Sequence, residues 1–299
     1  MEGIVGQIDN PRITIIIPNL NSRMIDRTLQ SILDQNYDLE CVEVLVVGLD
    51  SPNLVREDKR VHLISTGHQV SPAVARNIGL KMAKGNIICF TDADCLVSPD
   101  WLTQMTAPIF AGEAEVVGGS VRFSQENYWT LVDNLSWFHE FLDSKPAGDR
   151  KILPTLNICF YRDVFDKTGY MNENFPSAGG EDAEWTTRMR QNNLHLHFIP
   201  QAYVRHCPPR NSFKDVWRHA VKYGRHSVLV NPKFSHYIKP SVFISNRWLL
   251  LTFILPISFI ACSRIYMRDR SLWHLLYTFP GVFITKIAWC IGAANHAFR

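Results

Sequence analysis

The chain has 299 residues, 46% apolar and 20% charged, which suffices for one large domain with an appendage or for two smaller domains. Its formal net charge of +3 is unevenly spread: residues 1–204 hold 17 basic and 26 acidic side chains, and residues 205–299 hold 14 basic and 2 acidic ones. This distribution excludes a uniformly basic nucleic-acid-binding protein. An acidic body with a basic, apolar end indicates a soluble domain that carries a membrane-facing end.

The seven cysteines are odd in number and include no C-x-x-C pair, and the first ten residues contain no apolar run. We therefore expect reduced thiols, no secretory signal, and a catalytic domain on the cytoplasmic side.

The first ninety residues alternate between short apolar runs and segments with helical spacing. They predict strands at 13–17, 42–47, 61–64 and 86–91, and helices at 23–36 and 71–85. The first strand is expected to end at Pro18, and Ser71 is expected to cap the second helix. This order predicts an α/β fold with a mostly parallel open sheet, in which ligands bind beyond the carboxyl ends of the strands. The loops after residues 17, 47 and 91 should therefore meet at one crevice.

Further along the chain, the pattern predicts a strand at 115–121, a helix at 180–192 and a strand at 195–199, whereas residues 122–155 give no clear pattern. Residues 212–229 predict an amphipathic helix with a cationic face. Two apolar runs follow, at 242–263 and 272–294.

Each of these two apolar runs is borderline for spanning a bilayer, which takes about 20 apolar residues. If both crossed, the arginines between them would face the non-cytosolic side, so a shallow hairpin or an interfacial pair fits better. We divide the chain into a catalytic domain at 1–205, a basic helix and linker at 206–241, and membrane-associated helices at 242–299.

The segment TDADC at 91–95 places Asp92 and Asp94 at a strand end, where both carboxylates can face one point. Paired carboxylates repel each other unless a divalent cation lies between them, and hard oxygen ligands suit Mg²⁺ or Mn²⁺ against a pyrophosphate. An acidic pair on a surface turn is the alternative interpretation.

The segment GGEDAEW at 179–185 places Glu181 and Asp182 in the first turn of a helix, behind two glycines. Acids at this position are favoured by the helix dipole alone. The functional interpretation is a general base, with Trp185 and Met189 packing the helix onto the core. Elsewhere, Arg76 can pair with a phosphate or with an acid of the body, and His206 can be structural or a ligand.

Taken in order, five motifs resemble glycosyltransferase family 2 over roughly residues 12–225. They are IPNLNS (17–22), SPAVARNIGLKMAKGNIICFTDADC (71–95), NICFYRDVFDKTGYMNENF (157–175), GGEDAEW (179–185) and IPQAYVRH (199–206). The resemblance implies a GT-A fold and an inverting, metal-dependent transferase of hexosyltransferase type that uses a nucleotide-diphosphate sugar.

The resemblance also implies roles for individual residues. Asp92 and Asp94 match the metal and diphosphate motif, with Ala93 between them in the donor site, and His206 matches a position that ligates the metal or a phosphate in some members. Asp182 matches the catalytic base, and Glu181 beside it contacts acceptor or donor. The donor site further includes three matching positions: Pro18, Asn21 and Arg76.

One departure from the family pattern concerns the turn after the second strand. The family usually has two adjacent acids there, whereas this chain reads VVGLDSPN with Gly48 and Leu49 in their place. Either Asp50 takes over the role of these acids, or the nucleotide base is held through backbone groups.

The expected partners are the sugar donor, a glycan or lipid-linked acceptor in glycan or exopolysaccharide assembly, and a membrane contacted through the C-terminal region, with Mn²⁺ or Mg²⁺ as cofactor and no nucleic acid. Two alternatives remain. One is an inactive, membrane-attached sugar-binding protein, favoured only by the altered turn. The other is a sugar nucleotidyltransferase, which should carry a glycine-rich loop where this chain has PNLNSR.

Overall fold

The computed structural model of the chain describes residues 13–56, 58–227 and 242–296. These residues fall into two compact units. The first comprises the chain up to Arg122 together with Lys145–Ser177 and Glu181–Arg205, and the second comprises Phe123–Ser144, Ala178–Gly180 and the chain from His206 onward. The second unit is thus assembled from separate stretches of sequence, because residues from the middle of the chain join the C-terminal helices.

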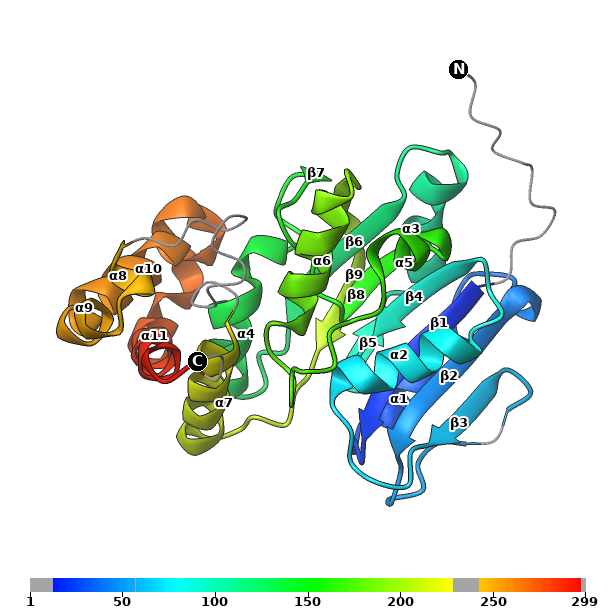
Figure 1. Ribbon diagram of the computed structural model, residues 1–299, viewed down its shortest axis with the longest axis horizontal. Coiled ribbons are helices and arrows are strands. Elements are labelled where there is room, and N and C mark those ends of the chain that lie inside the picture. Colours follow the sequence, from blue (N-terminus) through cyan, green and yellow to red (C-terminus); the bar gives the residue numbers. More distant parts are fainter. Residues whose placement is uncertain (1–12, 57, 228–241, 297–299) are drawn as a thin grey trace. The chain divides into compact units, whose positions relative to one another are not determined.

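The first unit is built on a sheet with the strand order β3-β2-β1-β4-β8-β6-β9-β5, and the short β7 pairs with β9 (Figure 1). The bounds are β1 Ile13–Leu20, β2 Val42–Leu49, β3 Val61–Ser65, β4 Ile87–Thr91, β5 Cys95–Val97, β6 Val116–Phe123, β7 Gly148–Asp149, β8 Asn157–Tyr161 and β9 Leu196–His206. Strands β1 to β4 pair in parallel, and β8 pairs antiparallel with both β4 and β6. The sheet is therefore mixed, with its parallel part where the sequence predicts it.

The helices α1 (Ile25–Leu33) and α2 (Pro72–Met82) belong to the two crossovers of this parallel part. The chain moves outward from β1 to β2 through α1 and returns from β3 to β4 through α2, so right-handed crossovers place the two helices on opposite faces of the sheet. Strands β1 and β4 lie side by side where the direction reverses, which is where open sheets bind their ligands. As predicted, the side chain of Ser71 caps α2 by accepting from the Val74 N–H group.

Strands β1 and β9 extend furthest beyond their predicted ends. Strand β1 continues through Pro18 to Leu20, because beyond Ile16 its ladder with β4 has ended and only β2 pairs with it. At that position the missing N–H group of a proline costs no bond on the β4 side. Strand β9 likewise continues past Pro200, and its alternation resumes with buried Ala202 and Val204 before it ends at His206.

The remaining elements of the first unit are α3 (Trp101–Phe110), α5 (Asp163–Thr168), α6 (Glu181–Gln191) and the short 3-10 turn η1 (Leu39–Cys41). Of these, the sequence pattern predicts only α6.

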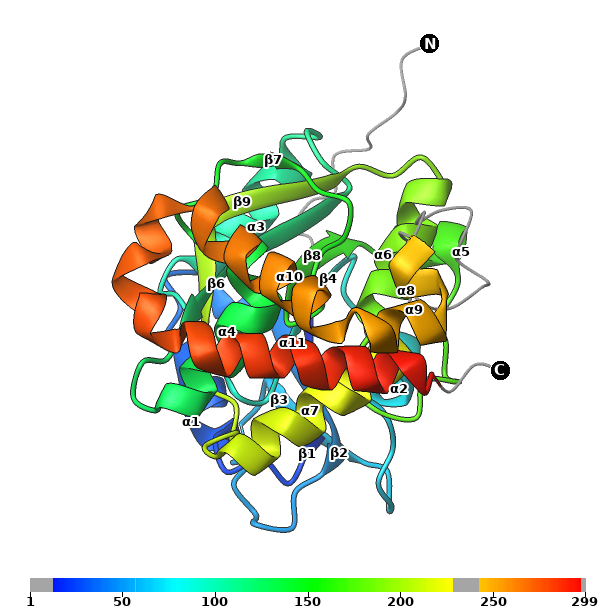
Figure 2. The same ribbon diagram turned by 90° about the vertical axis from the view of Figure 1, so that its left-hand side faces the viewer.

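The second unit is helical. Its elements are α4 (Tyr128–Phe138), η2 (His139–Phe141), α7 (Phe213–His226), α8 (Val242–Ser245), α9 (Arg247–Thr252), α10 (Ile254–Arg268), η5 (Arg270–Thr278) and α11 (Phe279–Ala294). Helix α11 lies between α10 and α7 and also contacts α4 (Figure 2). Two glycines allow the backbones of α7 and α11 to touch: a Cβ on Gly224 would lie 2.1 Å from the Trp289 carbonyl oxygen, and one on Gly292 would lie 1.9 Å from that of Val221.

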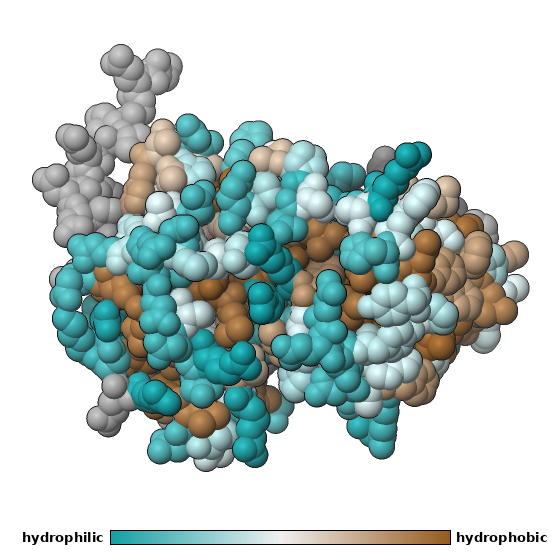
Figure 3. Space-filling model, turned by 180° about the vertical axis from the view of Figure 1, so that it is seen from behind, coloured by the Kyte–Doolittle hydropathy of each residue, from teal (hydrophilic) through white to brown (hydrophobic). Residues whose placement is uncertain are grey.

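Large apolar side chains are concentrated on the outside of this helical unit (Figure 3). The exposed ones from α9 to η5 are Trp248, Phe253, Leu255, Phe259, Ile260, Met267, Trp273, Leu276 and Tyr277, which we call the outer apolar face. Within the described residues, one helical segment, 270–294, is long and apolar enough to cross a membrane. Unlike the outer apolar face, it is partly covered, because 44% of its most apolar stretch is buried inside the protein.

Parts of three predictions lie outside the described residues. They are the absence of an N-terminal signal in residues 1–10, residues 228–241 of the predicted basic helix and linker, and the last three residues of the predicted membrane-associated region.

Candidate active site

Hydrogen bonds connect the loops after β1 and β2, as the sequence predicts. Asn21 adopts a left-handed conformation with φ 55°, its N–H group donates to the Leu49 carbonyl at 2.9 Å, and its Oδ1 accepts from the Ser51 N–H group at 2.7 Å. Asparagine tolerates this conformation better than most residues. The PNLNS segment therefore fixes the shape of both loops.

The altered turn after β2 has a steric cause. Gly48 has φ 139°, and a Cβ at this position would lie 1.9 Å from the carbonyl oxygen of Asn19 on β1. With this backbone conformation, an acidic side chain does not fit at position 48. The carboxylate of Asp50 holds the next loop by accepting from the Val55 N–H group at 2.7 Å, while its buried Oδ1 has no hydrogen-bond partner.

Asp92, Ala93 and Asp94 form the turn between β4 and β5, and both carboxylates are half-buried. The turn is closed by the Cys95 N–H group, which donates to the Asp92 carbonyl at 3.1 Å. It is joined to the loop after β1 by Ser22, whose hydroxyl donates to the Ala93 carbonyl at 2.8 Å. The predicted convergence of these loops is thus confirmed.

Arg76 on α2 links this turn to the start of α6. The side chain is only 2% exposed, and its guanidinium lies 2.6 Å from Asp92 Oδ1 and 3.7 Å from Glu181 Oε1. Of the two interpretations drawn from the sequence, the geometry therefore shows the pairing with acids. The Nε and Nη1 atoms of the guanidinium are buried without a hydrogen-bond partner.

Asp182 follows Glu181 in the first turn of α6, and its Oδ1 accepts from the Ala183 N–H group at 2.7 Å. Burial raises the pKa of the Asp182 carboxyl, and the nearby Asp92 raises it too, against the lowering effects of the Ala183 N–H group and Arg76. A position at a helix N-terminus by itself predicts a lowered pKa. That expectation was wrong, because desolvation outweighs the helix terminus.

The two glycines before α6 are required by the backbone. Gly179 and Gly180 have φ values of 121° and 100°, and a Cβ on Gly179 would lie 2.8 Å from a ring carbon of Tyr223. Conformations of this kind are essentially restricted to glycine.

Helix α6 is fixed to the core by Trp185 and Met189, both fully buried, as the sequence predicts. The Trp185 ring stacks on Phe90 of β4 with centroids 5.7 Å apart, and its Nε1–H donates to the Gly169 carbonyl at 3.0 Å. The strand that leads to Asp92 and the helix that carries Asp182 therefore share one aromatic contact.

His206 is the last residue of β9 and is 4% exposed. In the sheet, β9 neighbours β5, which begins directly after Asp94. The residue that holds this histidine, Asn134 of α4, is not predicted from the sequence, because residues 122–155 show no clear pattern. One signal was present: Asn127 caps α4 by accepting from two backbone N–H groups of its first turn.

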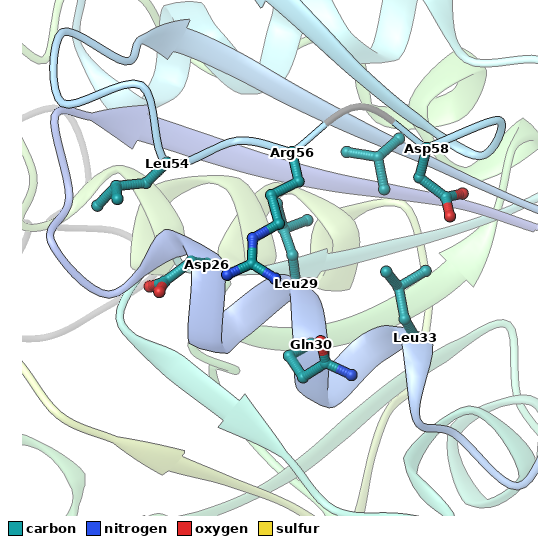
Figure 4. Close-up of a pocket in the computed structure, with 8 residues that line it drawn as sticks. Asp26, Leu29, Gln30, Leu33, Leu54, Arg56 and Asp58 are labelled. Atoms are coloured by element: carbon teal, nitrogen blue, oxygen red, sulfur yellow. The ribbon is translucent and has the colours of Figure 1, made fainter.

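A separate pocket of about 160 Å³ lies between α1 and the segment that leads to β3 (Figure 4). Figure 4 shows the Arg56 side chain reaching toward α1, which carries Asp26, Leu29, Gln30 and Leu33. The residues proposed from the sequence do not line this pocket.

The mixed sheet with its flanking helices is the GT-A fold of glycosyltransferases. The chain belongs to glycosyl transferase family 2, whose profile matches residues 14–168, just over half of the chain. It is therefore a glycosyltransferase, as the resemblance of its five motifs implies.

Individual relatives agree with this assignment. The chain is 24% identical to the glycosyltransferase AglE of Haloferax volcanii, covering 97% of this chain and 95% of AglE. It is 29% identical to the UDP-Glc:alpha-D-GlcNAc-diphosphoundecaprenol beta-1,3-glucosyltransferase WfaP of Escherichia coli, covering 57% of this chain and 66% of WfaP. Among solved structures, the mannosyltransferase PcManGT of Pyrobaculum calidifontis in complex with GDP-Man and Mn²⁺ is similar, with a TM-score of 0.63, 20% identity, and coverage of 96% and 88% of the two chains.

Proposed function

We propose that the protein is an inverting, metal-dependent glycosyltransferase that transfers a sugar from a nucleoside-diphosphate sugar to a hydroxyl of a lipid-linked or other membrane-proximal acceptor in glycan or exopolysaccharide assembly. The observation that carries this proposal is the position of Arg76, which contacts both Asp92 and Glu181. It brings the carboxylates suited to a metal and the start of the helix that bears Asp182 into one site.

The metal ligands fit Mn²⁺ or Mg²⁺, because Asp92 and Asp94 supply hard oxygen atoms on one tight turn. We assign His206, the last residue of β9, as a third ligand, because it matches a metal-ligating position of the family. When bound, the cation stabilises the negative charge that develops on the departing diphosphate. The Nε and Nη1 atoms of Arg76 have no hydrogen-bond partner, which supports the binding of an oxygen-rich anion at this site.

Asp182 acts as the general base in this proposal. Its carboxylate accepts the proton of the acceptor hydroxyl, whose oxygen forms a bond to the anomeric carbon while the bond from that carbon to the diphosphate oxygen breaks. A single displacement inverts the anomeric centre. The raised pKa of Asp182 makes its carboxylate a stronger base, and such perturbed carboxyls are typical of functional sites.

The nucleotide is held by the loops after β1 and β2 in this proposal, with Pro18, Asn21 and Ala93 contributing backbone contacts. Asp50 replaces the missing acids of the family, because its buried Oδ1 has no partner and can accept from an N–H group of the nucleobase. The donor is a uridine or guanosine diphosphate sugar in this proposal.

Membrane association is proposed for the helical unit, with the catalytic unit on the cytoplasmic side. WfaP acts on a diphosphoundecaprenol-linked sugar by its name, which supports an acceptor embedded in a membrane. The outer apolar face supplies the contact, and two arginines flank it. Half-buried Arg247 lies over the Trp248 ring at 5.2 Å, and exposed Arg270 lies over the Trp273 ring at 5.6 Å. Such a combination suits an anionic lipid surface.

We infer that the helices lie in the membrane surface and do not cross it. Helix α10 has 15 residues and is about 22 Å long, short of the ~30 Å hydrocarbon core. Helix α11 touches α7 backbone to backbone, and its Lys286 donates to the Ser136 carbonyl of α4 at 2.6 Å. Both contacts assign α11 to the interior of the helical unit.

The activity is tested with a panel of UDP- and GDP-sugars, Mn²⁺ and a polyprenyl-diphosphate-linked sugar acceptor. Release of a nucleoside diphosphate that depends on the acceptor, with an inverted anomeric product by NMR, is expected. Binding of a nucleotide sugar without release of nucleoside diphosphate would instead identify a sugar-binding protein, and a product of retained configuration would reject the single displacement.

The membrane contact is tested by sedimentation with vesicles of phosphatidylglycerol and phosphatidylcholine. Trp248→Ser and Phe259→Ser, at side chains 69% and 55% exposed, should each lower the bound fraction several-fold. Phe110→Ser is the matched control, because Phe110 of the first unit is 44% exposed outside the outer apolar face. Equal losses in all three variants would contradict the assignment.

A further inference from the structure

Asn134 of α4 holds His206 through two hydrogen bonds at once. Its Nδ2 donates to the backbone carbonyl of His206 at 3.1 Å, and its Oδ1 lies 2.5 Å from the Nδ1 atom of the same residue. Asn134 is fully buried and His206 is 4% exposed. Backbone and side chain of the histidine are therefore both fixed by one amide.

This arrangement determines which nitrogen of the imidazole carries the proton. A backbone carbonyl can only accept, so the amide nitrogen of Asn134 must face it, and the amide oxygen then faces the ring. An amide oxygen can also only accept, so the His206 Nδ1 atom must be the donor. In the neutral imidazole, the lone pair is consequently on Nε2.

A second residue of the same helix restricts the ring. Phe138 lies one turn beyond Asn134, and its ring meets the His206 ring edge-to-face with centroids 5.2 Å apart. Residues four apart lie on one face of a helix. The two side chains together fix the tautomer, the position and the plane of the imidazole.

We propose that Asn134 is a positioning residue that orients the Nε2 atom of His206 so that the neutral imidazole can bind a divalent cation. The inference rests on the proposed function, in which His206 is a ligand of the metal. Histidine ligands generally donate their second ring N–H group to a fixed acceptor, and loss of that acceptor typically weakens metal binding about 10- to 100-fold.

The test compares Mn²⁺ affinities, measured on the full chain by isothermal titration and by the electron paramagnetic resonance of free Mn²⁺. Asn134→Leu should weaken binding about 10- to 100-fold. Thr130→Val is the matched control. Thr130 lies one turn earlier on α4, and its hydroxyl contacts the Arg210 carbonyl, so the variant loses a hydrogen bond to the same loop without touching His206. This control should bind Mn²⁺ as the unmodified chain does.

His206→Ala separates the inference from the proposed function. If His206→Ala leaves the Mn²⁺ affinity unchanged, the metal assignment of the proposed function fails. If His206→Ala weakens binding and Asn134→Leu does not, the role of Asn134 is overturned while the metal site stands. Nitrogen chemical shifts of His206 in the unmodified protein give a readout that needs no folded variant: a protonated Nδ1 supports the inference, and a protonated Nε2 with bare Nδ1 rejects it.

Discussion

Replacing Asp182 with asparagine should have opposite effects on activity and on stability. The variant keeps the size of the side chain but has no basic oxygen, so the transfer rate should fall about 10²- to 10⁴-fold. This corresponds to about 2.7–5.4 kcal/mol of transition-state stabilisation. Affinity for the donor should change little, because the proposed base acts on the acceptor hydroxyl and not on the diphosphate.

The stability effect follows from the raised pKa of Asp182. A folded state that raises the pKa of a carboxyl favours its protonated form, so the unmodified chain loses stability as the pH rises through that pKa. Each tenfold change in the acid dissociation constant corresponds to about 1.4 kcal/mol. Asparagine cannot ionise, and Asp182→Asn should therefore melt at a higher temperature than the unmodified chain at pH 8, with the difference vanishing at acidic pH.

The assay combines initial rates at saturating donor and acceptor, donor titration by calorimetry, and thermal melts of the ligand-free protein from pH 4 to 8. Asp163→Asn is the control, because Asp163 is also in a first helical turn but its side chain is 59% exposed, and this variant should not gain stability. Near-normal transfer by Asp182→Asn would refute its role as base and make Glu181→Gln the next variant to test. A lower melting temperature at pH 8 would refute the argument from burial.

Three further predictions concern the neighbouring structure. Asp94→Asn should abolish Mn²⁺-dependent donor binding in calorimetry while the melting temperature stays nearly constant, since the residue lies on a half-buried turn. Arg76→Met should lower the free energy of unfolding by about 3 kcal/mol, because it removes a buried cation that pairs with both Asp92 and Glu181, and a loss below about 1 kcal/mol in urea titrations would contradict this. Gly292→Val should destabilise the helical unit by at least about 1–3 kcal/mol, because its Cβ would lie 1.9 Å from the Val221 carbonyl oxygen, and an unchanged melting curve would show that α7 and α11 do not touch.

The parallel part of the sheet could be predicted because its signals are local. Buried β-branched strands alternate with helices whose caps are visible in the sequence, such as Ser71 before α2. The meeting of the loops after β1 and β4 followed from topology alone, and the Ser22–Ala93 hydrogen bond confirms it.

Helix α4 could not be predicted because its pattern lacks a polar outer face. Asp133, Asn134 and Ser136 are all buried, so polar residues occur at positions where periodicity would place apolar ones. Two of these residues have partners distant in sequence: the amide of Asn134 bonds to a residue 72 positions away, and Asp133 pairs with Arg210 and His219. The pKa of Asp182 was mispredicted for a related reason, since the helix terminus is a local property whereas burial depends on the whole fold.

The proposed adsorption through the outer apolar face would have a kinetic consequence. An enzyme adsorbed through α9, α10 and η5 would share a two-dimensional layer with an acceptor anchored in the same bilayer, so their encounter rate would follow the mole fraction of acceptor among the lipids and not its concentration in the bulk. Adding inert lipid at constant acceptor and enzyme would then slow the reaction by dilution within the surface. A water-soluble acceptor analogue would show no such dependence.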